Sequence, residues 1–201
     1  PGGGYPGTFT DVADGGAHLR ELAVKYGLDL TRVVATGHSA GGHLALWAAA
    51  PIPPDSPLKR KQPVKIKAVV GIAAISDLAH YARSSGGACG ENTVAQLVDA
   101  TKRTPVNAGT GRAPVSEFEA PFRDTSPSAM LPLGVTQILI HGVYDGIVAP
   151  ANGWRYQARA KEKGETVELI SLENAGHYEL IAPWTAAGKV VVGKILEVLK
   201  Q

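Results

Sequence analysis

The clearest candidate for chemistry in this sequence is a serine between two glycines. Residues 37–41 read Gly-His-Ser-Ala-Gly, which places Ser39 at the centre of a Gly-x-Ser-x-Gly motif. A short β-branched run precedes the motif, and a stretch rich in Ala and Leu follows it. This order predicts a strand, a sharp turn and a helix, the setting in which a nucleophilic serine is held at the tip of a strained turn. We expect Gly37 and Gly41 to leave room where neighbouring chain passes too closely for a Cβ.

The turn would also place Ser39 at the positive end of the following helix. The first N–H groups of a helix have no partner within it, so they can receive an oxyanion that forms on an attacked carbonyl. The alternative is that Ser39 is an ordinary N-cap of that helix, a position that serine favours. In a chain with 24 glycines the motif alone is weak, and the predicted strand and helix around it favour the nucleophile.

A carboxylate and a histidine that could activate the serine come later in the chain. Asp145 lies in residues 141–148 and His177 in residues 174–179, and each stretch follows a predicted strand. A histidine can take the serine proton near neutral pH, and a carboxylate can fix the tautomer of the histidine and stabilise its charged form. The order serine, aspartate, histidine is the one expected for this chemistry on an α/β sheet.

Other roles stay open for several of these residues. Asp145 could instead stabilise its own loop, and Asp77, which also follows a predicted strand, is then the reserve acid. His177 could be a histidine satisfied within its loop. Five further side chains are expected to have structural roles: His38 and His43 in shaping the turn, His141 as a structural residue, and Tyr144 and Trp47 in packing.

Strands and helices alternate along the chain, which indicates how these residues are positioned. Apolar runs predict strands at residues 32–38, 66–74, 137–141 and 167–172. Helical spacing predicts helices at residues 10–26, 41–50, 150–163 and 183–199, the first of them capped by Thr10 or Asp11. The alternation predicts parallel βαβ units in a three-layer α/β/α sandwich with a mainly parallel sheet. Chemistry is expected at the carboxyl ends of the strands, which Ser39, Asp145 and His177 all follow.

We expect one domain over residues 1–201, with one irregular region. Residues 77–133 combine short helical pieces with connections rich in Gly, Ser and Pro. This region is either a lid or insertion over the substrate or a plain surface excursion.

Composition excludes several classes of function. With 44% hydrophobic and 19% charged residues, the chain is globular rather than disordered. The net charge of +2 is too small to indicate a nucleic-acid partner, and residues 59–61 (Lys-Arg-Lys) are expected to form a solvated turn. The six histidines lack metal-binding spacing, no apolar run is long enough for a membrane span, and the single Cys89 cannot form an internal disulfide. None of these features specifies a compartment.

Three stretches together resemble the α/β-hydrolase superfamily. They are Gly-His-Ser-Ala-Gly-Gly-His-Leu-Ala-Leu-Trp at 37–47, His-Gly-x-x-Asp-x-x-Val at 141–148, and Gly-His at 176–177. The resemblance runs over nearly the whole chain and is weakest between about 80 and 120. It is closest to the branch that holds small carboxylesterases, carbohydrate-type acetyl or feruloyl esterases, and kynurenine-formamidase-like amidases.

The resemblance implies a role for each candidate residue. Ser39 would be the nucleophile, Asp145 the acid and His177 the base, and the backbone N–H of Ala40 would lie in the oxyanion hole. The reaction would pass through an acyl-enzyme on a small ester substrate, without a cofactor or metal.

One departure from the family pattern concerns the oxyanion hole. A His-Gly-Gly type loop among the early strands usually supplies part of it, and no such loop is found in this sequence. Residues 1–9 resemble the segment just before the helix that precedes the serine turn, so the first strands of the usual sheet are expected to be missing. Residues 2–4, all glycine, could supply a replacement N–H.

The missing strands would leave the strand before Ser39 at an edge of the sheet, with unpaired backbone groups. We therefore expect a homo-oligomer that forms through this edge.

Three functions remain open. The first is a serine hydrolase of small carboxylic esters, and the second is an arylformamidase-like amide hydrolase. The third is a non-catalytic α/β-hydrolase-like binding module, which the incomplete oxyanion hole would favour. The intact set of Ser39, Asp145 and His177 favours an enzyme.

Overall fold

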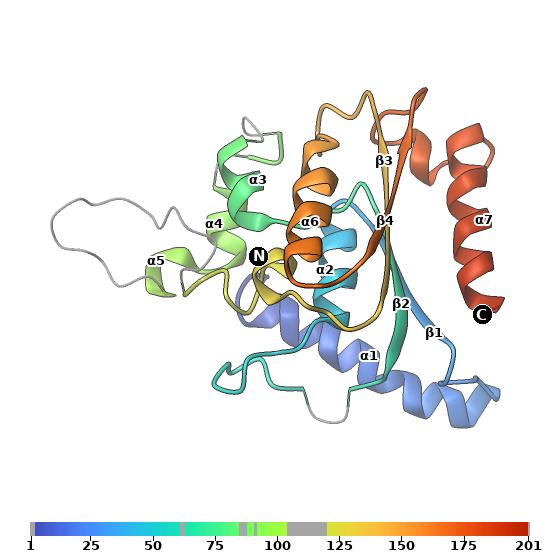
Figure 1. Cartoon of the computed structure of the whole chain (residues 1–201). Helices are drawn as coiled ribbons and strands as arrows, with labels where there is room; N and C mark the ends of the chain where they lie inside the picture. Colours follow the sequence, from blue (N-terminus) through green and yellow to red (C-terminus); the bar gives the residue numbers. More distant parts are fainter. Residues whose placement is uncertain (1–2, 61–62, 85–87, 91, 104–119, 201) are drawn as a thin grey trace, which may run out of the picture.

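A parallel sheet lies at the centre of the fold (Figure 1). The computed structural model describes residues 3–60, 63–84, 88–90, 92–103 and 120–200. Within these residues, four strands follow one another across the sheet in chain order: β1 (Val33–His38), β2 (Ile66–Ile72), β3 (Thr136–Gly142) and β4 (Val167–Leu172). Each neighbouring pair is parallel, as predicted. The four strands therefore end at the same edge of the sheet.

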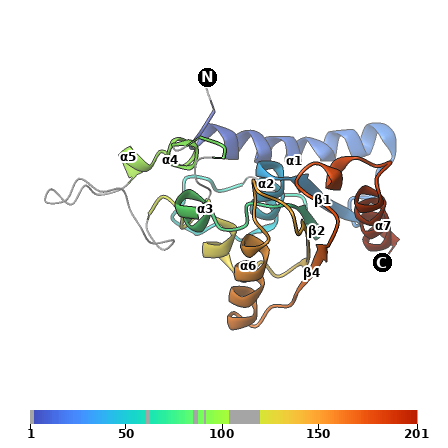
Figure 2. The same ribbon diagram turned by 90° about the horizontal axis from the view of Figure 1, so that it is seen from above.

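Helices cover both faces of this sheet. α2 (Ala40–Ala49) and α6 (Ala151–Glu162) lie on one face, and α7 (Ala186–Lys200) lies on the other (Figure 1, Figure 2). α1 (Gly7–Tyr26) runs beside α2 and extends past the β1 end of the sheet (Figure 2). This is the predicted three-layer α/β/α sandwich.

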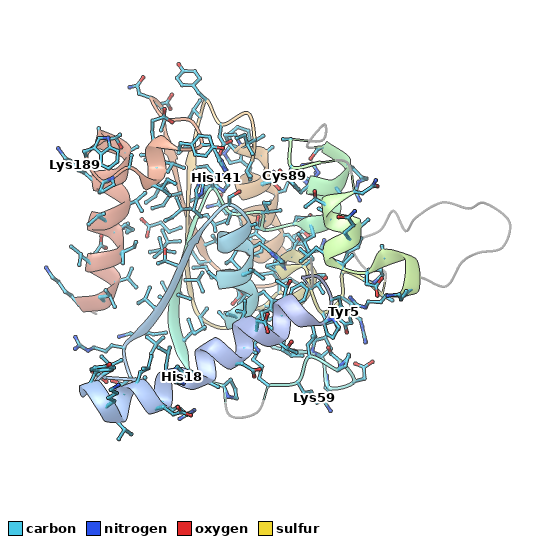
Figure 3. All side chains as sticks on the ribbon, turned by 180° about the vertical axis from the view of Figure 1, so that it is seen from behind. Tyr5, His18, Lys59, Cys89, His141 and Lys189 are labelled. Atoms are coloured by element: carbon cyan, nitrogen blue, oxygen red, sulfur yellow. The ribbon has the colours of Figure 1, made fainter. Side chains whose placement is uncertain are left out.

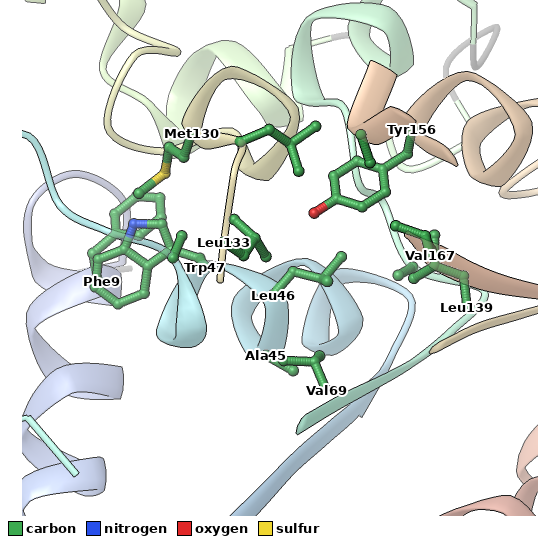
Figure 4. Packing of buried hydrophobic residues seen from close by; sticks show 14 of the residues in the cluster. Phe9, Ala45, Leu46, Trp47, Val69, Met130, Leu133, Leu139, Tyr156 and Val167 are labelled. Atoms are coloured by element: carbon green, nitrogen blue, oxygen red, sulfur yellow. The ribbon is translucent and has the colours of Figure 1, made fainter. Parts of the chain in front are cut away.

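Apolar side chains fill the space between the sheet and the helices on both faces (Figure 3). The cluster on the α2 side contains the large buried residues Phe9, Leu46, Trp47, Leu139 and Tyr156 (Figure 4). The cluster on the α7 side contains Val70, Ile140, Leu180, Val191 and Val198. The central strands β2 and β3 are thus buried on both faces, and strands in that position carry near-continuous apolar runs.

The irregular region between β2 and β3 has helices of its own. They are α3 (Leu78–Ser84), α4 (Thr93–Leu97), α5 (Ala100–Arg103) and the 3₁₀ helix η1 (Pro127–Met130). A third apolar cluster joins this region to the loop after β3 through Leu78, Tyr81, Val98, Phe122 and Val148. Residues 104–119, the middle of the expected lid, lie outside the described residues.

The start of α1 differs from the prediction. The helix begins at Gly7, three residues before the expected cap, because the N–H of Thr8 already bonds to the carbonyl of Gly4 at 2.8 Å. Thr10 lies inside the helix, where its hydroxyl bonds to the carbonyl of Gly7 at 2.8 Å. Within the described ranges no helix, α1 included, is both long and apolar enough to cross a membrane.

Arg60 does not lie in a solvated turn, as the basic run 59–61 predicted. Its guanidinium bonds to the carbonyls of Trp47 and Ala50 at 2.9 and 2.8 Å, and also to that of Ala48. It also stacks on the Trp47 ring, 4.8 Å from the centroid. Arg60 therefore caps the C-terminus of α2, where carbonyls lack helical partners and a cation is favoured.

Candidate active site

The predicted serine turn joins β1 directly to α2. Ser39 lies between His38, the last residue of β1, and Ala40, the first residue of α2. Its φ of 57° and ψ of −120° are strained for a residue with a Cβ. Its N–H bonds to the carbonyl of Ile72 at 2.8 Å, and its carbonyl accepts the N–H of His43 at 3.1 Å. The backbone is therefore held on both sides of the strained residue.

Close packing explains one of the two flanking glycines and corrects the prediction for the other. A Cβ on Gly37 would lie 2.2 Å from the carbonyl oxygen of Gly41. A Cβ on Gly41 would meet nothing within 4 Å, so the expectation that Gly41 leaves necessary room is wrong. The next residue, Gly42, has that role, because its Cβ would lie 2.7 Å from the Cβ of Ala74.

His177 and Asp145 form a buried pair. The Nδ1 atom of His177 lies 2.7 Å from Oδ2 of Asp145, and their side chains are 6% and 0% exposed. The other carboxylate oxygen, Oδ1, accepts the backbone N–H groups of Ile147 and Val148 at 2.8 Å each. A carboxylate that faces Nδ1 fixes the proton on that nitrogen and leaves Nε2 to act as a base.

The two loops that carry this pair are packed backbone to backbone. The N–H groups of Val143 and Tyr144 bond to the carbonyls of Leu172 and Ala175 at 3.0 Å each. A Cβ on Gly142 would lie 2.3 Å from the carbonyl oxygen of Ala175. The glycine in the His-Gly-x-x-Asp pattern is therefore required by this close approach.

His38 connects the serine turn to the loop of His177. Its Nε2 lies 2.9 Å from the backbone carbonyl oxygen of His177, and the two imidazole centroids are 4.3 Å apart. The prediction for His38 was limited to a role in shaping the turn. No sequence pattern predicts this contact, because the two residues are 139 positions apart.

Asp77, the reserve acid, has a different partner. Its Oδ1 accepts the N–H of His80 at 2.8 Å, in the first turn of α3. This is the contact of a helix-capping aspartate.

The remaining predicted residues divide between core and surface. His43 and His141 are fully buried, and burial lowers the pKa of each to about 4. Nε2 of His43 lies 2.7 Å from the carbonyl of Thr125. Trp47 is fully buried, as expected for a packing residue. Tyr144 is 73% exposed, so the packing role predicted for it is wrong.

Of the N-terminal glycines proposed to supply an oxyanion N–H, Gly4 has its N–H already bonded. The N–H of Gly4 donates to Oγ1 of Thr8 at 2.8 Å and is therefore engaged within the start of α1. Gly2 lies outside the described residues. In the described part of the chain, His, Cys, Asp and Glu form no group of three or more that could hold a metal ion.

Solved structures with the same fold include several esterases. A truncated form of a carbohydrate esterase from gut microbiota superposes with a TM-score of 0.71 at 20% identity, over 98% of this chain and 70% of that chain. An acetyl ester-xyloside bifunctional hydrolase from Caldicellulosiruptor lactoaceticus gives 0.69 at 19%, over 98% and 66%. The propionate-bound esterase Est2 from Thermogutta terrifontis gives 0.67 at 20%, over 96% and 64%. The chain thus spans about two thirds of the length of these proteins.

Comparison of the sequence with protein-family models assigns the chain to a family. No curated protein matches the chain. A family model named BD-FAE matches residues 3–153, which include the serine turn and the loop of Asp145. Because this match extends over most of the sequence, the chain belongs to BD-FAE, a family of α/β-hydrolases.

Proposed function

We propose that this chain is a serine hydrolase that cleaves small carboxylic esters through an acyl-enzyme intermediate. The observation that carries the proposal is the buried contact of 2.7 Å between Nδ1 of His177 and Oδ2 of Asp145. The strained backbone of Ser39 at the β1–α2 turn supports it, because such strain persists where function requires it.

In each step of the reaction, a named residue accepts or donates the proton. Oγ of Ser39 attacks the ester carbonyl and gives its proton to Nε2 of His177, while Asp145 stabilises the resulting imidazolium. The C–O bond of the ester breaks, and the departing alcohol takes the proton from His177. A water then attacks the acyl group, gives its proton to His177, and the carboxylic acid leaves as Ser39 Oγ regains that proton.

The N–H of Ala40 would receive the developing oxyanion. Ala40 is the first residue of α2, where helical N–H groups lack partners within the helix. The loss of one oxyanion donor costs on the order of a hundredfold to a thousandfold in kcat. Residues 1–201 taken alone contain no His-Gly-Gly loop, so we expect slow turnover when this stretch is assayed by itself.

The names of the structural neighbours support short acyl groups as substrates. One is an acetyl ester-xyloside hydrolase, and Est2 was solved with propionate and with butyrate bound. These names describe those proteins, and they lead us to expect acetyl to butyryl esters for this chain.

The first test compares the purified chain with Ser39→Ala on p-nitrophenyl acetate and p-nitrophenyl butyrate. We expect hydrolysis that disappears in Ser39→Ala. N-formylkynurenine serves as the amide substrate, and faster turnover of it than of either ester would favour the arylformamidase-like alternative.

The second test separates a slow enzyme from a binding module. Paraoxon phosphorylates Thermogutta terrifontis esterase 2, and we expect it to label Ser39 here, with the added mass located by peptide mapping. Equal background hydrolysis by both proteins, with no label on Ser39, would refute the hydrolase and favour the non-catalytic module.

A further inference from the structure

His38 makes the one side-chain hydrogen bond recorded between the serine turn and the loop of His177 in the described part of the chain. Its Nε2 can bond to a carbonyl oxygen only as a donor, so the 2.9 Å distance to the carbonyl of His177 places a hydrogen on Nε2. The bond links the residue before Ser39 to the backbone of the histidine that must reach Ser39. Only a narrow range of positions of the His177 loop keeps this hydrogen bond.

The His38 ring also limits where the His177 ring can lie. The two centroids are 4.3 Å apart with planes tilted by 51°, and the Tyr178 ring stands edge-on to His177 at 5.2 Å. Asp145 holds the Nδ1 side of the same imidazole. His177 is therefore fixed by its carbonyl, by Nδ1 and by ring contacts.

We propose that His38 is a positioning residue, whose Nε2–H holds the loop of His177 so that the imidazole of His177 reaches Ser39. This inference rests on the proposed hydrolase function. A misplacement of about 1 Å in a catalytic group can cost on the order of a hundredfold in rate, so a single bond at this point matters.

The charge of His38 is suited to the position. Burial lowers the pKa of His38 and the neighbouring His177 lowers it further, while the bond to the carbonyl of His177 and the carboxylate of Asp145 act in the opposite direction. A neutral His38 keeps its donor without repelling the imidazolium that forms on His177. The ring groups that face it are those of His177 and Tyr178, and the charged group is Asp145.

The test uses two variants of His38 whose side-chain N–H donors lie at different distances from Cα. His38→Gln places an amide N–H about as far from Cα as Nε2 of histidine, and His38→Asn carries the same amide one bond shorter. We expect His38→Gln to keep kcat within about threefold of the wild type. We expect His38→Asn to lose at least tenfold in kcat on p-nitrophenyl acetate, with KM little changed. His18→Gln is the matched control, because His18 lies at the opposite end of the molecule from His141, a residue of the strand β3 that precedes Asp145 (Figure 3).

A second measurement needs no turnover. The proton that Nδ1 of His177 shares with Asp145 is expected to give a low-field proton resonance, present in the wild type and His38→Gln and broadened in His38→Asn. Equal kcat and equal resonances in the two variants would overturn the positioning role, as would equal losses in both. A wild type without hydrolysis would refute the proposed function, while the resonances would still decide the role of His38.

Discussion

Asp145 divides its two carboxylate oxygens between two tasks. Oδ2 faces His177, and Oδ1 accepts the backbone N–H groups of Ile147 and Val148. The carboxylate therefore fixes its own loop as well as the imidazole. The sequence left these two roles as alternatives, and the structure contains both contacts.

This division allows a substitution that spares the loop. In Asp145→Asn the amide oxygen can still accept the two N–H groups, but the amide presents donors to Nδ1 of His177. We expect kcat on p-nitrophenyl acetate to fall by about a hundredfold to ten-thousandfold, with the melting temperature close to that of the wild type.

Asp77→Asn is the matched control for this prediction. Asparagine is as good a helix cap as aspartate, so this variant should keep both its stability and its kcat. A loss of activity in Asp77→Asn with full activity in Asp145→Asn would reverse the assignment of the acid.

At the scale of elements, the serine turn depends on how closely β1 and α2 approach each other. Gly37→Ala would place a Cβ against the backbone of Gly41, which cannot move without disturbing the start of α2. We expect a loss of several kcal/mol in the free energy of unfolding, measured in urea.

Gly41→Ala is the matched comparison, since its Cβ would meet nothing within 4 Å. Alanine costs less than glycine in a helix, so we expect this variant to be as stable as the wild type or more stable by up to about 1 kcal/mol. A loss in Gly41→Ala as large as that in Gly37→Ala would contradict the difference in packing between the two positions.

The elements that the sequence predicted well are those with strong local patterns. The apolar run at 167–172 coincides with β4, and Gly27 ends α1 in a left-handed conformation, as expected. The candidate residues could be proposed from the sequence because Ser39, Asp145 and His177 each follow such a run. Parallel strands bring the ends of these runs to one edge.

The features that were missed depend on contacts between distant parts of the chain. Arg60 reads as a solvated residue in a basic run, and only the fold places it against the end of α2. Polar residues that favour caps predict a later start for α1, whereas the carbonyls of Gly4 and Pro6 already accept the first helical N–H groups. The close approach of Gly142 to the carbonyl of Ala175 also joins distant parts of the chain, so the sequence alone does not predict it.

At the scale of the whole molecule, two buried histidines make stability depend on pH. His43 and His141 have pKa values of about 4 in the folded state, below the value of about 6.5 for an exposed histidine. The unfolded chain therefore takes up protons first as the pH falls. The free energy of unfolding should be constant above about pH 7 and decrease towards pH 4.

We expect a loss of about 2 kcal/mol for each of these histidines between about pH 7.5 and pH 5. Urea unfolding followed by circular dichroism at the two pH values measures it. An unchanged free energy of unfolding at pH 5 would mean that the two histidines can be protonated without unfolding.

The edge of the sheet supports the proposal of self-association. In the described residues β1 pairs with β2 alone, and an apolar groove of about 180 Å³ lies between β1 and α1. Phe9 is the only fully buried residue of α1, while Val24 and Tyr26 are 90% and 62% exposed. An open edge of this kind is a template for another strand.

We expect a second copy to pair with this edge around a two-fold axis, which would make one continuous sheet. Light scattering over a dilution series should show a dimer that dissociates on dilution. A monomer throughout the micromolar range would contradict the proposal.

The position of β1 at this edge also affects the order in which the molecule opens. Ser39 follows a strand without any fully buried residue, while His177 and Asp145 follow strands on the far side of β2. Elements with few buried contacts open locally at a lower free energy than the core. In the monomer, amide protons of β1 should therefore exchange with solvent before those of β2 and β3. Fraying of this edge would separate the serine from an intact Asp145–His177 pair, so hydrolysis would be lost under conditions in which most of the fold survives.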